Sequence, residues 1–373
     1  MPKKTTAKPS RKPVAKKTVK KSAAKAIATP RVKAAHRTSK TVNLALQGGG
    51  SHGAYTWGVL DRLLEEEKLT IDGISGASAG AMNAIALAQG MAAGGRRGAQ
   101  EALRKLWKDV SEMHALSPVQ RNPLDALLGN WTLNNSPSYM AYDMLSRVAS
   151  PYVTNPLGLN PLRVLLKNMI DFKAVRACEE MKLFISATNV RTGRVRIFER
   201  HEITADVMAA SSCLPSLFQA IKIGKDHYWD GGYMGNPVLW PLIYKCESRD
   251  IVVVQINPIT RNELPQTAQE INNRLDEITF NAPLMSEMRA ISFASKLLDE
   301  GILDPKRYKK MLIHRIHSES KMDTLDASSK VNAEWDFLLK LHRWGQNAAD
   351  NWLKAHWHQV GRSSSVNIRS EFL

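Results

Sequence analysis

Cysteine is scarce in this sequence of 373 residues, and long uninterrupted hydrophobic runs are missing. The three cysteines, Cys178, Cys213 and Cys246, form no closely spaced pair, which argues against a zinc site and against a disulfide framework. The basic amino terminus is not followed by the apolar run of a secretory signal, and no stretch is long enough to cross a bilayer. We therefore expect a protein of the reduced cytosol, either free or peripheral at a membrane or lipid surface.

Acidic residues are missing from the first 40 positions, which carry 14 of the 52 Lys and Arg side chains. The rest of the chain has 38 basic and 35 acidic residues, so most of the formal net charge of +17 belongs to this tail. The tail lacks apolar periodicity and cannot bury enough surface to offset the entropy of ordering it. We predict that residues 1–40 are a disordered basic tail, which suits contact with an anionic membrane or nucleic acid, or is a dispensable extension.

Strand and helix patterns alternate after the tail. A strand pattern over 41–46 leads through glycines to helical spacing over 54–67, and a strand pattern over 69–75 leads through a tight turn to an Ala-rich helix over 79–93. Two consecutive units of this kind imply right-handed crossovers between parallel strands. The sequence therefore predicts an α/β fold with a mainly parallel central sheet.

Residues 115–170 interrupt this alternation, because they are rich in Pro, Asn, Leu, Met, Trp and Tyr. We interpret them as an inserted cap segment over the site. Its aromatic residues Trp131, Tyr139 and Tyr142 suit either an apolar mouth for an acyl chain or ordinary core packing.

Strand patterns resume at 183–189 and 195–199 and finish with a β-branched run over 251–256, which is typical of a strand buried on both faces. We expect the core sheet to end there. The chain then divides into the tail, a catalytic domain over 41–260, and a mainly helical carboxyl-terminal extension over 261–373.

The segment Gly76-Ala77-Ser78-Ala79-Gly80 matches the nucleophile elbow G-x-S-x-G. Small residues surround the serine in such an elbow because the turn between strand and helix is strained and larger side chains would clash with nearby backbone. The pattern alone is equally compatible with a structural turn at the start of an Ala-rich helix. Ser78 is the candidate nucleophile.

Three consecutive glycines, Gly48, Gly49 and Gly50, follow the first predicted strand. Their amides could point inward together as an oxyanion hole for a tetrahedral acyl intermediate. The loop lacks the Gly-Lys-Ser/Thr of a nucleotide-binding P-loop. The spacing of Gly48, Gly50 and Gly53, with Asp72 further on, also fits a dinucleotide-binding fingerprint, which stays open as a minor interpretation.

Asp230 precedes two glycines, Gly231 and Gly232, and on its own this pattern describes a common turn. Beside an elbow serine the carboxylate acquires a function, because a serine hydroxyl is a poor nucleophile until a neighbouring base removes its proton. The two glycines are expected to let the backbone pass close to the elbow. Asp230 is the candidate base.

These three motifs, in this order, resemble those of the patatin-like phospholipases, and residues 209–218 resemble the segment that this family carries just before its aspartate. The similarity spans residues 42–258. It implies a three-layer α/β/α fold and hydrolysis of lipid acyl esters through a Ser-Asp dyad, without a catalytic histidine, metal or organic cofactor. By this resemblance Ser78 is the nucleophile, Asp230 the base, and the amides of Gly48–Gly50 the oxyanion hole.

His52 stands where many members of that family carry Arg or Lys, so the preference for phosphate headgroups is open. It could equally be a spacer that faces solvent. A Ser-His-Asp hydrolase would instead need a late histidine, for which His342, His356 and His358 are available. An alternative of a different class is a non-catalytic protein that binds nucleic acid or an anionic surface through its tail.

Overall fold

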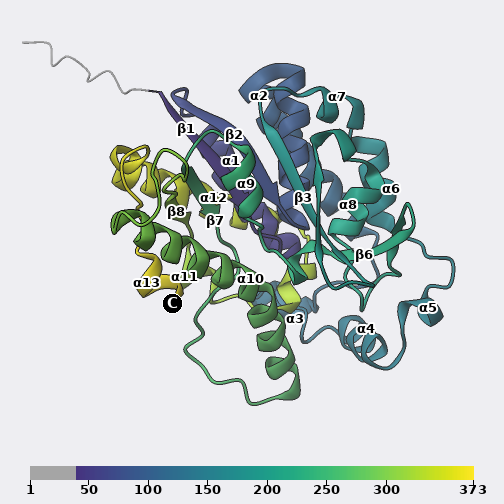
Figure 1. The fold of residues 1–373 in the computed structure, drawn as a ribbon. Helices are drawn as coiled ribbons and strands as arrows, with labels where there is room; N and C mark the ends of the chain where they lie inside the picture. The colour runs from purple at the N-terminus through teal and green to yellow at the C-terminus, as the bar shows by residue number, and fades with distance from the viewer. Residues whose placement is uncertain (1–38) are drawn as a thin grey trace, which may run out of the picture. The chain divides into compact units, whose positions relative to one another are not determined.

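The computed structural model describes residues 39–373. The predicted disordered tail, residues 1–40, lies outside the described residues except for Ser39 and Lys40, and Lys40 is the first residue of β1. In the described part, eight strands form one sheet (Figure 1). The strands are β1 (Lys40–Leu46), β2 (Leu69–Gly76), β3 (Lys182–Asn189), β4 (Val195–Glu199), β5 (Ile221–Ile223), β6 (Asp226–Asp230), β7 (Asp250–Val254) and β8 (Leu312–Ile316).

The strand order along the sheet is β5-β6-β3-β2-β1-β7-β8, and β4 also pairs with β3. Strands β3, β2, β1, β7 and β8 run parallel, whereas β4, β5 and β6 add antiparallel pairs at the β3 side. The mainly parallel sheet that the sequence predicts is therefore confirmed. Parallel neighbours also bring the carboxyl ends of β1 and β2 together, and the two predicted catalytic loops begin there.

Helices cover both faces of the sheet, which gives the predicted three layers. The helices are α1 (Gly53–Leu64), α2 (Ala79–Ala115), α3 (Pro123–Leu128), α4 (Pro137–Val148), α5 (Pro151–Thr154), α6 (Pro161–Met169), α7 (Phe172–Ala177), α8 (Ala205–Ser211), α9 (Trp240–Lys245), α10 (Ala268–Asp299), α11 (Glu319–Met322), α12 (Trp335–His356) and α13 (Ile368–Phe372). Short 3-10 turns are η1 (Gly50–His52), η2 (Arg200–Glu202), η3 (Gly231–Tyr233), η4 (Ser328–Val331) and η5 (Trp357–Gln359).

The fully buried β7 shows how one strand serves two hydrophobic cores. Val252 and Val254 face the core that contains residues of α1, α2 and α12, while Ile251 and Val253 face the core built with α9, α10 and α13. Side chains alternate across a strand, so a β-branched run without polar interruption is what a strand between two helical layers requires.

The prediction that the sheet ends at Ile256 is wrong, because β8 lies parallel to β7 beyond it. The sequence of β8, Leu-Ile-His-Arg-Ile, places a histidine and an arginine in a short strand, so its pattern is weak. His314 is nevertheless fully buried, and its Nε2 lies 3.0 Å from Asp250 Oδ1 in β7. This contact satisfies the hydrogen-bonding need of the buried imidazole. From the hydrophobic pattern alone, the histidine would be expected at the surface.

The cap segment, residues 115–170, contains α3, α4, α5 and α6, and the end of α2 leads into it. Each of these four short helices begins with a proline. Proline is favoured at the first helical position because its fixed φ suits the helix and its missing N–H would be unpaired there. Figure 1 shows α3, α4 and α5 beyond the ends of the strands.

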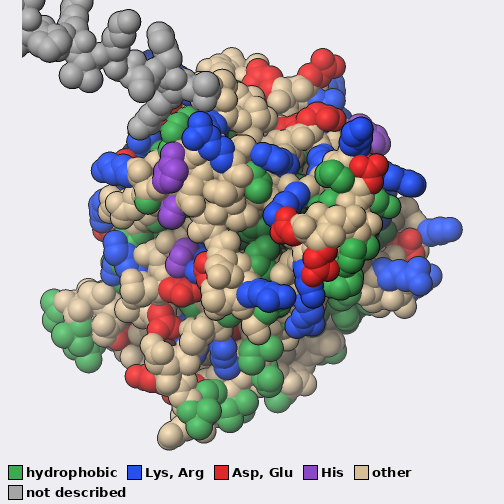
Figure 2. Space-filling view, turned by 60° about the vertical axis from the view of Figure 1, so that its left-hand side comes forward, with side chains coloured by type: hydrophobic (Ala, Val, Ile, Leu, Met, Phe, Trp, Pro, Cys, Tyr) green, Lys and Arg blue, Asp and Glu red, His purple; other side chains and the backbone are tan. Residues whose placement is uncertain are grey.

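The face drawn in Figure 2 carries basic and acidic side chains next to one another, in keeping with the near balance of charge after the tail, and hydrophobic side chains gather along its lower edge. Among the helices of residues 39–373, none is both long and apolar enough to cross a membrane.

Candidate active site

Ser78 occupies a strained turn between β2 and α2, with φ 52° and ψ −124°. Within residues 39–373 it is the only residue other than glycine with a positive φ. The glycines of the elbow (Gly76–Gly80) are required by close packing, since a Cβ on Gly80 would collide with the backbone of Leu46 and one on Gly76 would lie 2.8 Å from Ala81 N. Strain of this kind persists only when the surrounding structure holds it, and it is concentrated at functional sites.

The glycine loop (Gly48–Gly53) passes directly beside the elbow. A Cβ on Gly48 would lie 2.7 Å from Ser78 Cβ and from Ala77 O. Gly50 has φ 56°, and a Cβ there would collide with the carbonyl of Lys330 in η4. These contacts explain two of the three consecutive glycines by backbone packing alone.

A buried polar network fixes the start of this loop. The Gly48 amide donates to Asn236 Oδ1 at 2.6 Å, and Gly48 O accepts from Asn257 Nδ2 at 2.8 Å. Gln47 Oε1 accepts from the amides of Ile256 and Asn257 at 2.9 and 3.0 Å. The Gly48 amide is therefore already engaged and buried, whereas an oxyanion donor needs a free N–H.

The amides of Gly49 and Gly50, the other two predicted donors, differ from that of Gly48 in their hydrogen bonding. Gly49 and Gly50 line the cavity that contains Ser78, and Gly50 is exposed. Neither amide donates a hydrogen bond to an acceptor among residues 39–373. Two backbone N–H groups of cavity-lining residues thus have no acceptor in the described part of the chain.

Asp230 is the last residue of β6 and is buried, with a relative exposure of 1% for the whole residue. Its backbone is held on both sides, because its amide donates to Cys213 O at 2.8 Å and its carbonyl accepts from Thr188 Oγ1 at 2.8 Å. Its Oδ1 accepts from the Gly232 amide at 2.7 Å. The carboxyl group is thus oriented through three separate hydrogen bonds.

Burial raises the pKa of Asp230 to about 7, against the opposing effect of the Gly232 amide and the Ser78 hydroxyl, which lower it. Asp230 Oδ2 is buried and has no hydrogen-bond partner in the described part of the chain. The Ser78 hydroxyl therefore lies near this carboxyl without forming a regular hydrogen bond to Oδ2. Catalytic hydrogen bonds often tighten only when substrate is bound. Oδ2 is thus the unoccupied acceptor of the carboxyl.

The segment 209–218 connects the two candidate catalytic residues. Ser211 Oγ accepts from the Ser78 amide at 3.0 Å, and Cys213 O accepts from the Asp230 amide. Leu214, Ser216 and Leu217 continue along the cavity wall. All four motifs of the sequence analysis therefore meet at one place.

The pair Gly231-Gly232 has a different packing reason from the one predicted. A Cβ on Gly231 would collide with the backbone of Ser186 in β3, and one on Gly232 would collide with the ring of Phe280 in α10. The elbow is approached directly by Gly48. Ser186 Oγ also donates to Gly76 O of the elbow at 3.5 Å, so a single side chain separates Gly231 from the elbow.

The cavity around Ser78 and Asp230 has a volume of about 240 Å³. Its walls come from the glycine loop, the cap segment, α10 and η4. Tyr139 and Tyr142 of the cap segment line it, whereas Trp131 stacks on Phe337, with ring centroids 5.1 Å apart. The aromatic residues of the cap segment thus divide between the cavity and the core.

His52 is buried and does not face solvent as a spacer. Its Nε2 lies 2.8 Å from Ser329 Oγ, and this hydroxyl already donates to Asp326 O, so Nε2 carries the proton and donates. Burial, together with the charges of Lys330 and Arg261, holds the pKa of His52 well below its ordinary value. His52 is a neutral anchor for η4.

Lys330 of η4 lines the cavity and was not predicted. Its Nζ donates to Asn257 Oδ1 at 3.0 Å. No sequence signal marks it, since it lies far along the chain from the loop that it contacts.

The residues that the alternative functions would require lie outside the cavity of Ser78 and Asp230. Among the described residues that line this cavity none is a histidine, and His342 instead bonds Asp61 at 2.8 Å while His356 bonds Gln359 at 2.7 Å. Asp72 accepts from the amides of Glu247 and Ser248, which is a structural use of the acid that the dinucleotide interpretation required. Across residues 39–373 no group of three or more His, Cys, Asp or Glu side chains is arranged to hold a metal ion.

Two solved structures are weakly similar to this chain. It has 15% sequence identity to VipD from Legionella pneumophila, with a TM-score of 0.32, over 82% of this chain and 67% of that chain. It has 15% identity to the ExoU–SpcU complex of the type III secretion system of Pseudomonas aeruginosa, with a TM-score of 0.32, over 86% of this chain and 53% of that chain. The chain thus spans about half the length of that second structure.

None of the curated proteins compared with the chain matches it. A family model described as Patatin-like phospholipase matches residues 44–243, a span that contains Ser78, Asp230 and the glycine loop. This span is more than half of the 373 residues. The chain belongs to the patatin-like phospholipase family of lipid hydrolases.

Proposed function

We propose that this protein hydrolyses the acyl esters of lipids, with Ser78 as nucleophile and Asp230 as general base. The observation that carries the proposal is the shared cavity, in which a strained elbow serine, a buried carboxyl with one free oxygen and two free backbone amides all meet. These are the nucleophile, base and oxyanion donors that acyl transfer requires.

In the first half of the reaction Asp230 Oδ2 accepts the hydroxyl proton while Ser78 Oγ attacks the ester carbonyl carbon. The carbonyl oxygen gains negative charge, and the amides of Gly49 and Gly50 donate to it. Collapse of this intermediate breaks the bond to the alcohol, which leaves with the proton from Asp230. The acyl group remains bonded to Ser78 Oγ.

In the second half a water molecule loses a proton to Asp230 and attacks the acyl carbon. The same two amides stabilise the second oxyanion, and Ser78 Oγ leaves as it recovers the proton. The fatty acid is released and the site is regenerated. Asp230 suits both steps, because burial raises its pKa to about 7, near the value that serves a base best at neutral pH.

The test is hydrolysis of p-nitrophenyl esters of several chain lengths, with a chelator present, by the wild type, Ser78→Ala and Asp230→Asn. We expect each substitution to reduce kcat by at least about a thousandfold. A variant with His342, His356 and His358 changed to Ala is the matched control and should retain activity. Hydrolysis that survives Ser78→Ala, or that depends on the histidines, would contradict the proposed dyad.

A further inference from the structure

Two cationic side chains line the cavity, and only one of them is paired with a carboxylate. Arg147 donates to both oxygens of Asp143, at 2.9 and 3.2 Å. Lys330 donates to the amide oxygen of Asn257 and, within residues 39–373, has no carboxylate within 4.0 Å. Lys330 is therefore the cation of the cavity that is left for a ligand.

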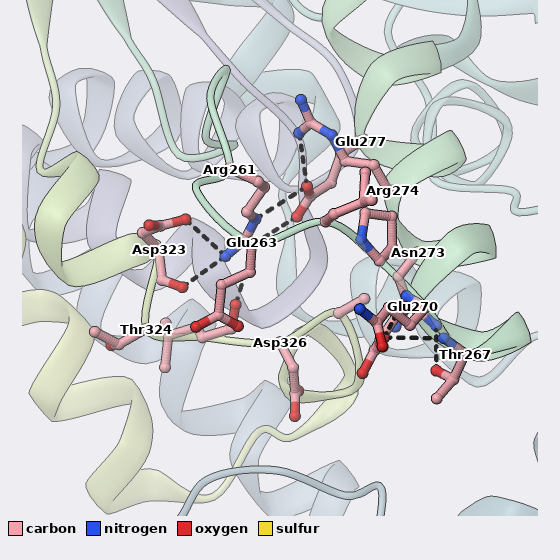
Figure 3. A pocket seen from close by; sticks show the side chains of 15 residues that line it. Arg261, Glu263, Thr267, Glu270, Asn273, Arg274, Glu277, Asp323, Thr324 and Asp326 are labelled. Carbon is pink, nitrogen blue, oxygen red and sulfur yellow. Dashed lines mark hydrogen bonds and ion pairs between the residues drawn. The ribbon is translucent and has the colours of Figure 1, made fainter.

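The acids nearest to Lys330 do not neutralise it directly. Glu277 is engaged by Arg261 at 2.6 Å and by Arg274 at 3.1 Å (Figure 3). Asp276 lines the same cavity, and it forms no ion pair within the described residues. An ammonium has three donors, and here one of them is used, so two remain for an acceptor in the cavity.

Lys330 is held in place from three sides. Ser329, next to it, is bonded by His52 and by Asp326. The Lys330 carbonyl packs against Gly50, which allows no side chain there. The lysine is thus rigidly attached to the loop whose Gly49 and Gly50 amides we propose as oxyanion donors.

Burial lowers the pKa of Lys330, and the charge of Arg261 adds to this effect, while Glu277 and Asp276 oppose it. A partly desolvated ammonium gains most from an opposite charge brought into contact with it, because the anion favours the charged form. An anion in contact with Lys330 therefore gains more than a neutral group does, against the opposing charge of Asp276 in the same cavity.

We propose that Lys330 forms an anion subsite beside Ser78, which binds the phosphodiester group of a phospholipid substrate. This inference rests on the proposed function, because an ester bound at Ser78 brings its headgroup into the same cavity. The fatty acid product offers the same anionic chemistry through its carboxylate, so the experiment must separate the two sources.

The first arm compares phosphatidylcholine with diacylglycerol of the same acyl chains, in the same non-ionic mixed micelles. Lys330→Met should lower kcat/KM for the phospholipid by about 10- to 100-fold, the usual effect of losing a hydrogen bond to a charged group, with little change for diacylglycerol. Lys330→Arg should recover part of the loss. Lys306→Met removes one exposed positive charge outside the cavity and is the matched control.

An equal loss on both lipids would overturn the proposal, because it would make Lys330 a support for the loop through Asn257. No loss on either lipid would overturn it too. If the wild type hydrolyses no ester, or Ser78→Ala remains active, the proposed function fails instead, and the second arm still tests the subsite.

The second arm measures equilibrium binding to Ser78→Ala and to Ser78→Ala combined with Lys330→Met. The ligands are hexadecylphosphocholine, which carries a phosphodiester and no acyl ester, and palmitate. Binding of hexadecylphosphocholine should weaken at least about tenfold in the double variant. A loss confined to palmitate would assign the subsite to the product carboxylate and overturn the phosphodiester assignment.

Discussion

The inner and outer walls of the proposed active-site cavity differ in how firmly the chain holds them. The inner wall, with the glycine loop, the elbow and Asp230, lies at strand ends and is tied down by buried hydrogen bonds from distant segments. The outer wall includes α4, in which no residue is buried. The groups proposed for chemistry are therefore rigidly positioned, whereas the groups proposed to meet the acyl chain depend on few buried contacts.

The distribution of exposed apolar side chains follows the same division. Of 26 large hydrophobic residues exposed in the described part of the chain, 14 lie between Leu116 and Val164, so the cap segment carries most of this surface. In α4, Tyr139 and Tyr142 line the cavity while Met144 and Val148 are exposed. One short helix thus serves the cavity with one side and leaves apolar side chains exposed on the other.

The largest expected effect on stability concerns Asp230. Burial raises the pKa of this carboxyl to about 7 from an unfolded value near 3.8, so its neutral form contributes stability that is complete below about pH 4 and is lost as the pH rises through 7. Asp230→Asn cannot ionise. Relative to the wild type, the variant should gain about 4 kcal/mol in free energy of unfolding between pH 4 and pH 8.

This gain is measured by urea denaturation at several pH values. Ser78→Ala is the control, because it keeps the titrating carboxyl. A difference between Asp230→Asn and the wild type that does not change with pH would show that the inner wall does not hold Asp230 in a desolvated state.

The second effect concerns the network that fixes the glycine loop. Gln47→Leu keeps the size of a buried side chain but leaves the amides of Ile256 and Asn257 without their acceptor. Unsatisfied buried donors cost about 1–3 kcal/mol each, so we expect a loss of about 3 kcal/mol in the free energy of unfolding. Urea denaturation at one pH measures this loss. A loss below about 1 kcal/mol would mean that the hydrogen bonds of Gln47 do not hold the inner wall in place.

The sequence was sufficient where the determinants are local. Ser78 was predicted because the elbow needs its small neighbours within two residues on each side, and the parallel sheet because its strands alternate with helices. Gly48 was predicted as an oxyanion donor from its place in the loop, whereas the acceptor that engages its amide is Asn236, 188 positions away. Long-range polar pairs of this kind leave no periodic pattern.

The strands that escaped prediction are β5, β6 and β8, and they are short. In β5 and β8, apolar residues are interrupted by Lys222, His314 and Arg315, and the partners of His314 and Arg315 are visible only in the fold. Lys330 escaped for the same reason, because a lone lysine in a turn is ordinary until the turn is found against the glycine loop. Residues that come together from distant segments could not be predicted from the sequence.

The third effect is the pH dependence of the reaction. If Asp230 must be ionised to accept the Ser78 proton, kcat/KM should fall about tenfold for each pH unit well below its pKa of about 7, hence about 50-fold from pH 7, where half is ionised, to pH 5. The fall of kcat/KM is measured with a neutral p-nitrophenyl ester, because this substrate does not itself titrate in the range. A rate that stays constant down to pH 5 would mean that the carboxyl is not desolvated in the working enzyme.

The smallest effect belongs to the outer wall. Met144 is 69% exposed on α4 and does not line the cavity, so Met144→Gln removes apolar surface without leaving a void or an unpaired buried group. Such surface substitutions usually change the free energy of unfolding by less than about 0.5 kcal/mol, and urea denaturation should show a change of that size. Hydrolysis of a short soluble ester should also be unchanged, because the groups proposed for chemistry lie on the inner wall. A loss of stability as large as that of Gln47→Leu would mean that the cap segment is packed as firmly as the sheet, and the contrast between the two walls would disappear.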